Sequence, residues 1–338
     1  MIIFHTADNH LNSSLKTRLN EKQAEKINAE LIFAFEEICT IASEKKAEAL
    51  IIAGDLFDGK NVTGSVLQRV KRIVENHPEL LFLYVYGNHD YDQKNDIFEL
   101  FPENFKVMSP DTSIKRGNVV FYAYGQNLPT LDRDAFNIVI GHGQTVKSES
   151  FNSDEINLSF LKNKNIDYAA LGHIHKFSLE QLDERCYYAY SGCPMGRGFD
   201  EVGRKGCVEI NTDEKTFTFV PLNTRQFYIE SVNVENFPSS FELEKALKEK
   251  LNFDESSFVR LVLNGLVSSE EQGDFSYITE YFKEKFFYFE LVDQTAFNYE
   301  TLITEDRTSL KNEFIKVVQA SNEPFAKEII ETGLKYLK

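Results

Sequence analysis

Short apolar runs alternate with longer amphipathic segments along the first part of the chain. The runs are four to eight residues long and rich in β-branched and aromatic residues, which is typical of buried strands. Between the first three runs, apolar residues recur at three- and four-residue intervals, which predicts helices at residues 21–46 and 65–76. Strand, helix, strand, helix, strand is the order of a parallel sheet with crossover helices.

The next four apolar runs follow one another with short connections. They lie at residues 118–125, 136–142, 166–173 and 185–192. Strands that succeed one another without long helices predict a second sheet. The fold class expected for residues 1–225 is therefore α/β, with two sheets forming a sandwich and helices outside.

The pattern changes after residue 225. Alternating strand patterns and two helical patterns predict a small α+β domain at residues 226–295, and two further helical patterns occupy residues 296–338. We therefore expect three parts, at residues 1–225, 226–295 and 296–338.

Composition limits the classes of protein that the chain can belong to. The 338 residues include no apolar run near the ~20 residues of a membrane helix, so we expect no membrane segment. Four cysteines without CxxC spacing indicate reduced thiols, and Met1 leads directly into a predicted strand, so a cytoplasmic location is expected.

The net charge of −16 is unusual for a protein that binds nucleic acid alone. Residues 1–225 contain 25 basic and 32 acidic side chains, and residues 226–338 contain 12 and 21. The second part is therefore the more acidic per residue, and most of the excess negative charge per residue lies outside the first domain.

Ligand-type side chains follow five of the predicted strands. They are Asp8 and His10; Asp55 and Asp58 in "GDLFD"; Asn88, His89 and Asp90 in "GNHD"; His142 in "GHG"; and His173 and His175 in "GHIH". Five of the seven histidines of the chain lie in these clusters, which chance would scatter. Loops beyond the carboxyl ends of parallel strands converge on one crevice, so we expect these residues to meet.

The donor types predict a metal site. Imidazole nitrogen, carboxylate oxygen and amide oxygen suit Mn²⁺, Fe²⁺ or Zn²⁺ better than Ca²⁺. These ligand-type residues are too many for one ion, and a carboxylate can bridge two cations about 3.5–4 Å apart. Asp55 is the candidate bridge.

The ordered motifs D-x-H, GDxxD, GNHD, GH and GHxH resemble those of the calcineurin-like metallophosphoesterase superfamily. With "YSGCPMGRGFDEVGRKGC", they are most similar to the SbcD-type DNA repair exonucleases, close to the YhaO-like branch. The resemblance implies two facing mixed sheets flanked by helices, an αββα sandwich. It also implies that Asp8, His10 and His175 hold one ion, that Asn88, His142 and His173 hold a second, and that Asp55 is shared.

The resemblance further implies a hydroxide between the two ions as the nucleophile and a catalytic role for His89, which would contact the phosphate and protonate the leaving oxygen. Asp58 would orient His89, or would instead cap a helix that begins just after "GDLF". His5 is either a support for Asp8 or, more simply, a half-buried histidine with a backbone partner. Arg197, Arg204 and Lys205 lie in a glycine-rich turn and are candidates for phosphate contacts.

The expected activity is phosphodiester hydrolysis by a Mn²⁺-dependent DNA exonuclease or endonuclease. Asp58 is followed by Gly59 and Lys60, whereas phosphoprotein phosphatases of the superfamily continue this motif with arginine and glycine. A small-molecule phosphodiesterase is the alternative enzyme, and a non-catalytic assembly subunit is a third hypothesis. The resemblance implies DNA, an SbcC-like coiled-coil ATPase and a second copy of the chain as partners.

The last predicted helix has one apolar face. Its members are Phe325, Ile329, Ile330, Leu334 and Leu337. The resemblance implies that residues 1–225 form the catalytic domain, that residues 226–295 form a capping domain and that this face docks on the partner ATPase. The alternative is that the face packs against the chain's own capping domain.

Overall fold

The computed structural model of the chain describes residues 1–15, 19–59, 62–90, 95–147, 154–267, 273–298, 309–321, 323–334 and 336–337. They form two compact units, Met1–Thr224 and Arg225–Lys338. Lys60 lies outside the described residues.

The first unit contains two six-stranded mixed sheets, as the sequence predicts. Across the first sheet the order is β14 (Thr216–Pro221), β13 (Gly206–Asn211), β1 (Ile2–Thr6), β2 (Ala49–Ala53), β3 (Leu81–Val85) and β4 (Phe105–Val107). Across the second it is β11 (Ser178–Gln181), β12 (Tyr187–Tyr190), β10 (Tyr168–Gly172), β7 (Phe136–His142), β6 (Val119–Ala123) and β5 (Ser113–Arg116). Strands β1 to β4 are mutually parallel, as are β6, β7, β10 and β12.

The core of this unit lies between the two sheets. Strand alternation directs Ile3, Ile51 and Leu83 of the first sheet toward Phe121 and Ile138 of the second, and all five are fully buried. The two sheets are therefore fixed against each other by close packing of their inner faces.

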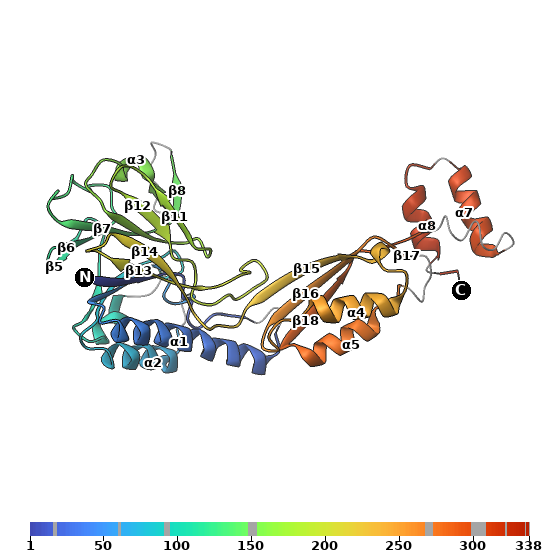
Figure 1. Cartoon of the computed structure of the whole chain (residues 1–338), viewed down its shortest axis with the longest axis horizontal. Helices are drawn as coiled ribbons and strands as arrows, with labels where there is room; N and C mark the ends of the chain where they lie inside the picture. The colour runs from blue at the N-terminus through green and yellow to red at the C-terminus, as the bar shows by residue number, and fades with distance from the viewer. Residues whose placement is uncertain are drawn as a thin grey trace. The chain divides into compact units, whose positions relative to one another are not determined.

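Helices α1 (Glu21–Glu44) and α2 (Gly64–Glu75) cover the outer face of the first sheet (Figure 1). A capping box of Asn20 and Gln23 begins α1, and Thr63 caps α2. Short elements complete the unit: β8 (Gln144–Val146), β9 (Glu155–Asn157), α3 (Leu158–Leu161) and a 3₁₀ helix, η1 (Asn95–Leu100).

The second unit contains a parallel three-stranded sheet with crossover helices. Its elements are β15 (Phe227–Asn233), η2 (Val234–Asn236), α4 (Ser240–Lys250), β16 (Phe258–Asn264), α5 (Ser276–Lys285) and β18 (Tyr288–Asp293). Strands β17 (Leu266–Val267) and β19 (Ala296–Phe297) form a separate parallel pair. Apolar residues of α4 and α5 form a separate buried core with this sheet.

The terminal helices α7 (Leu310–Ala320) and α8 (Ala326–Leu334) pack on each other (Figure 1). Ile330 is buried against Ile315 and Val318 of α7, and Leu334 packs on the same small core. Phe325 and Ile329, in contrast, are 65% and 40% exposed. Helix α7 therefore covers part of the predicted apolar face, and the rest is exposed to solvent.

Among the described residues, no helix has the length and apolar character that crossing a bilayer requires.

Candidate metal centre

Nine of the predicted site residues lie at the carboxyl ends of parallel strands from both sheets. They are Asp8 and His10 after β1, Asp55 and Asp58 after β2, Asn88 and His89 after β3, His142 at the end of β7, and His173 and His175 after β10. Because the inner faces of the two sheets pack together, these strand ends meet at one edge of the sandwich.

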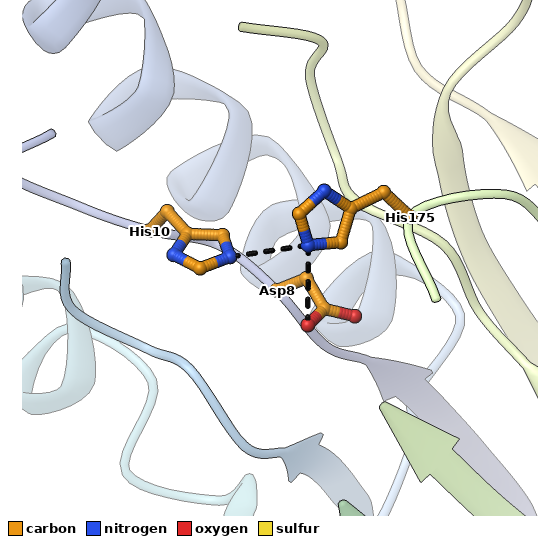
Figure 2. A group of neighbouring side chains, drawn as sticks. All are labelled: Asp8, His10 and His175. Carbon is orange, nitrogen blue, oxygen red and sulfur yellow. Dashed lines mark hydrogen bonds and ion pairs between the residues drawn. The ribbon is translucent and has the colours of Figure 1, made fainter. Parts of the chain in front are cut away.

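Asp8, His10 and His175 form the first group of candidate ligands (Figure 2). Nε2 of His10 lies 3.3 Å from Nε2 of His175, and Nε2 of His175 lies 3.7 Å from Oδ1 of Asp8. Asp8 and His10 thus direct ligand atoms at His175, which lies 165 positions beyond His10 in the sequence.

Asn88, His142 and His173 form the second group. Oδ1 of Asn88 lies 3.0 Å from Nε2 of His142 and 3.3 Å from Nδ1 of His173. One amide oxygen and two imidazole nitrogens thus lie close enough together to coordinate a single cation.

Asp55 lies between the two groups. Its Oδ2 atom is 3.7 Å from Nε2 of His10 in the first group and 3.4 Å from Nε2 of His142 in the second. Its Oδ1 atom accepts a hydrogen bond of 2.9 Å from the backbone N–H of His89. This fixed carboxylate is placed where a ligand shared by two ions would be needed.

The orientation of two histidines fits metal binding. Nδ1 of His142 donates to the carbonyl oxygen of Ala53 at 2.9 Å, and Nδ1 of His175 donates to Oε1 of Glu201 at 2.5 Å. In each ring, Nε2 is left as the nitrogen that points into the cluster. The donor set and its orientation therefore fit divalent cations of the Mn²⁺, Fe²⁺ or Zn²⁺ type.

Burial dominates the electrostatics of two members of the first group, Asp8 and His10. It raises the pKa of Asp8 to about 6, against the lowering effect of the charges of His142 and His175, and it lowers the pKa of His10 to about 4. Burial would also raise the pKa of Asp55 and lower that of His142. Their mutual hydrogen bond, the neighbouring charges and backbone hydrogen bonds together outweigh burial, so that the pKa of Asp55 is lowered and that of His142 is raised to about 9. A cation that binds here replaces protons of this cluster.

The backbone of the cluster is strained. Asp8, His10, Asp55 and His173 have positive φ angles of 53°, 45°, 50° and 103°. A non-glycine residue in such a conformation costs on the order of 1–3 kcal/mol, and these conformations concentrate at functional sites. The fold thus maintains unfavourable conformations at four of the seven candidate ligands.

His89 and Asp58 form a pair beside the cluster. Nδ1 of His89 lies 2.9 Å from Oδ1 of Asp58, and Ser13 donates a hydrogen bond of 2.5 Å to Oδ2 of Asp58. No helix begins at Asp58, since α2 begins at Gly64 with Thr63 as its cap, so the alternative of a helix cap is wrong.

Asp90, the last residue of "GNHD", joins two of the ligand loops. Its buried carboxylate accepts backbone hydrogen bonds from Leu56, Phe57 and Gly87 at 3.1, 3.0 and 3.3 Å. The loop that carries Asp55 is thereby attached to the loop that carries Asn88.

His5 is completely buried, so the expectation of a half-buried residue is wrong. Its Nδ1 atom lies 3.0 Å from the hydroxyl of Tyr168. Burial lowers its pKa to about 3, against the raising effect of the backbone of Leu171. His5 is a neutral core residue that links the two sheets.

The sequence analysis did not identify Glu201, and it left the role of the basic residues near it open. Arg197 contacts Asp58 and Glu201, whereas Lys205 is buried and donates to the carbonyl oxygen of His175 at 2.9 Å. Arg204 is exposed. In the sequence, only the glycine-rich spacing distinguishes this segment. Such spacing does not show which of its charged side chains are buried.

Comparison with known proteins identifies relatives. A family model described as calcineurin-like phosphoesterase matches residues 1–177. The DNA double-strand break repair protein Mre11 of Sulfolobus acidocaldarius is 23% identical over 304 residues, which cover 79% of this chain and 76% of that protein. The protein of the same name from Methanosarcina acetivorans is 24% identical over 84% of this chain and 48% of its own length.

A bacterial relative and two solved structures are also similar. The uncharacterized metallophosphoesterase YhaO of Bacillus subtilis is 26% identical over 78% of this chain and 72% of its own length. TT1561 of Thermus thermophilus has a TM-score of 0.43 at 12% identity, covering 65% of this chain and 98% of its own. A dimetal phosphatase from Danio rerio has the same TM-score at 10% identity, covering 62% and 91%.

Proposed function

The chain belongs to the calcineurin-like phosphoesterase family, and on that premise we propose that it is a metal-dependent DNA nuclease that acts in the cytoplasm. The observation that carries the proposal is the contact of His89 with Asp58 beside the cluster of candidate ligands. The choice of DNA is supported by two relatives named as DNA double-strand break repair proteins. The similarity to the first covers 79% of the chain, more than the first unit alone contains.

We assign the candidate ligands to two ions. Asp8, His10 and His175 hold one ion, Asn88, His142 and His173 hold the other, and Asp55 contacts both. When bound, two divalent cations supply the Lewis acidity that activates water and neutralises the charge of a phosphate. Mn²⁺ is the proposed metal, with Fe²⁺ or Zn²⁺ as alternatives that the same donors accept.

His89 is the proposed proton donor for the leaving oxygen. Its side chain is 45% exposed, whereas the neighbouring carboxylate of Asp58 is 18% exposed. The contact of Nδ1 with Asp58 leaves Nε2 available to a substrate in solvent. Asp58 thus orients the ring, and Asn88 and His89 together mark the face at which a phosphodiester enters.

The first test compares wild type with His89→Ala in Mn²⁺ on linear duplex DNA, single-stranded DNA and bis-p-nitrophenyl phosphate. We expect wild type to degrade DNA and the variant to lose at least about 100-fold in rate, with unchanged metal content. His77→Ala, which removes a histidine bonded to Ser43 away from the site, is the matched control and should retain activity. Cleavage of the small diester alone, even with a candidate ATPase added, would favour a small-molecule phosphodiesterase and overturn the nuclease proposal.

We propose the following division of labour for the chain. Residues 1–225 carry out the hydrolysis, residues 226–295 form a cap that receives DNA, and residues 296–338 dock on an SbcC-like coiled-coil ATPase. The docking proposal is supported by the exposed Phe325 and Ile329 of α8. Substitution of both by serine should abolish copurification with the ATPase. Phe241→Ser, at a site that is 74% exposed on α4, is the control that should leave copurification unchanged.

We also propose that the chain is a homodimer. The exposed side of α1, where Phe33 is 55% exposed, is the candidate interface. Light scattering of wild type and Phe33→Glu tests this proposal, because a monomeric wild type would overturn it and a dimeric variant would exclude this surface.

A further inference from the structure

Glu201 determines which nitrogen of His175 faces the cluster. Nδ1 of His175 lies 2.5 Å from Oε1 of Glu201, whose side chain is only 6% exposed. A neutral imidazole has one N–H and one lone pair, so donation from Nδ1 leaves the lone pair on Nε2. That Nε2 atom is the one that faces Asp8 and His10 (Figure 2).

Glu201 is itself held from several directions. It ends a turn in which its N–H donates to the carbonyl oxygen of Gly198 at 3.0 Å. Its Oε2 atom accepts the backbone N–H of Arg197 at 2.6 Å and lies 3.8 Å from Sγ of Cys193. The carboxylate therefore has little freedom to turn away from His175.

Arg197 connects Glu201 to the proposed catalytic pair. Its Nη2 atom lies 3.3 Å from Oε1 of Glu201, and its Nη1 atom lies 3.3 Å from both Oδ2 of Asp58 and Oγ of Ser13. One guanidinium thus lies between two carboxylates, and each carboxylate contacts a different histidine. The result is a continuous series of side chains, His175, Glu201, Arg197, Asp58 and His89.

We propose that Glu201 and Arg197 are positioning residues of the nuclease site. Glu201 holds His175 in the orientation that binds the first ion, and Arg197 fixes Glu201 and Asp58 in one arrangement, so that this ligand and His89 keep their mutual geometry. The inference rests on the proposed function and extends it to two residues that contact neither substrate nor metal.

A third ion at Glu201 is the competing explanation, since His175, Cys193 and Glu201 bring ligand atoms within 4.8 Å of one another. The guanidinium of Arg197 lies 3.3 Å from the same Oε1 atom and supplies the positive charge there. The contacts therefore favour a supporting carboxylate over a ligand.

The test measures Mn²⁺ binding by metal-free protein, using electron paramagnetic resonance of the free ion. We expect two bound ions in wild type, and in Glu201→Ala a roughly 10- to 100-fold weaker affinity for one of them. Glu201→Gln retains the shape of the side chain and should give a smaller loss, and Asp200→Ala, at the exposed neighbouring carboxylate, should give none. Wild-type affinities in both Glu201 variants would overturn the proposal, as would equal weakening of both ions or binding of a third.

Arg197 is tested by kinetics on bis-p-nitrophenyl phosphate and DNA. We expect Arg197→Ala to lower kcat about 10-fold or more while KM stays within about twofold, and Arg72→Ala, at an exposed arginine of α2, to match wild type. A raised KM for DNA with unchanged kcat would make Arg197 a phosphate contact and overturn its positioning role.

These outcomes are separable from failure of the nuclease proposal. Two-ion binding by a wild type that does not cleave DNA would overturn only the nuclease, because the Mn²⁺ measurement involves no substrate. Failure of wild type to bind two ions would overturn both.

Discussion

Nδ1 of His89 and Oδ1 of Asp58 lie 2.9 Å apart at the point where a buried cluster of ligand-type residues opens to solvent. Asp58 also accepts from Ser13 and Arg197, so its carboxylate is fixed independently of the histidine. A side chain anchored in this way can orient the more exposed ring of His89 without being disturbed when a substrate enters.

Asp58→Asn should lower kcat of the proposed hydrolysis about 10- to 100-fold. The amide retains the size of the carboxylate, but only one of its two ends can accept a hydrogen bond, so it cannot accept from both His89 and Arg197. Steady-state kinetics with bound metal determined in parallel checks the prediction. Full activity in the variant would show that His89 does not depend on Asp58.

Gly87→Ala should abolish metal binding and activity together. A Cβ atom at Gly87 would lie 2.1 Å from Oδ1 of Asp55 and 2.5 Å from its backbone nitrogen, so this loop or the candidate bridging carboxylate must move. Gly64→Ala introduces the same methyl group where no atom lies within 4 Å and serves as the control. Metal analysis of both variants decides the matter, and stoichiometric binding by Gly87→Ala would contradict the packing argument.

Removal of divalent cations should lower the melting temperature. Asp8 and Asp55 lie among histidine nitrogens that face one another, and cations that bind only the folded cluster stabilise it by about 2.7 kcal/mol per ion at 100 times Kd. Calorimetry after EDTA treatment and after Mn²⁺ addition measures the difference, which should be several degrees. Asp55→Asn should respond much less, and an equal response would argue against a shared carboxylate.

His5 should make the first unit less stable as the pH falls below about 6.5. In the folded protein burial lowers the pKa of His5 to about 3. Between pH 6.5 and pH 3, His5 therefore binds a proton in the unfolded chain but not in the folded chain, and this difference favours unfolding. The loss is about 1.4 kcal/mol per pH unit between these two values. In metal-free protein, denaturant unfolding of His5→Asn should show a shallower loss than wild type, and equal slopes would contradict the prediction.

The sequence predicted the sandwich and its candidate ligands because both depend on local patterns. Short apolar runs indicated the strands, and the carboxyl ends of parallel strands lie at one edge whatever the details of the loops. Asp8 and His175 are separated by 167 positions in the sequence, yet each directly follows a predicted strand.

The residues that support the cluster could not be predicted in this way. Glu201 and Arg197 lie in a turn without periodicity, and the contact of Arg197 with Asp58 joins residues 139 positions apart. For His5, strand alternation gives the face of the sheet but not what covers it, and the second sheet with Tyr168 decides its burial. Asp58 was ambiguous because a carboxylate near a helix start and a carboxylate near a histidine look alike in sequence.

The pairing of β1 with β13 has a consequence for the synthesis of the protein. Ile2 pairs with Asn211, so one edge of the first strand stays open until more than two hundred residues have been made. His173 and His175 likewise emerge long after Asp8 and His10. On the ribosome, the first ligands are therefore made long before the last ones. The complete ion-binding arrangement can form only when synthesis nears the end of the first unit. The long-range pairing of β1 with β13 then closes the sheet.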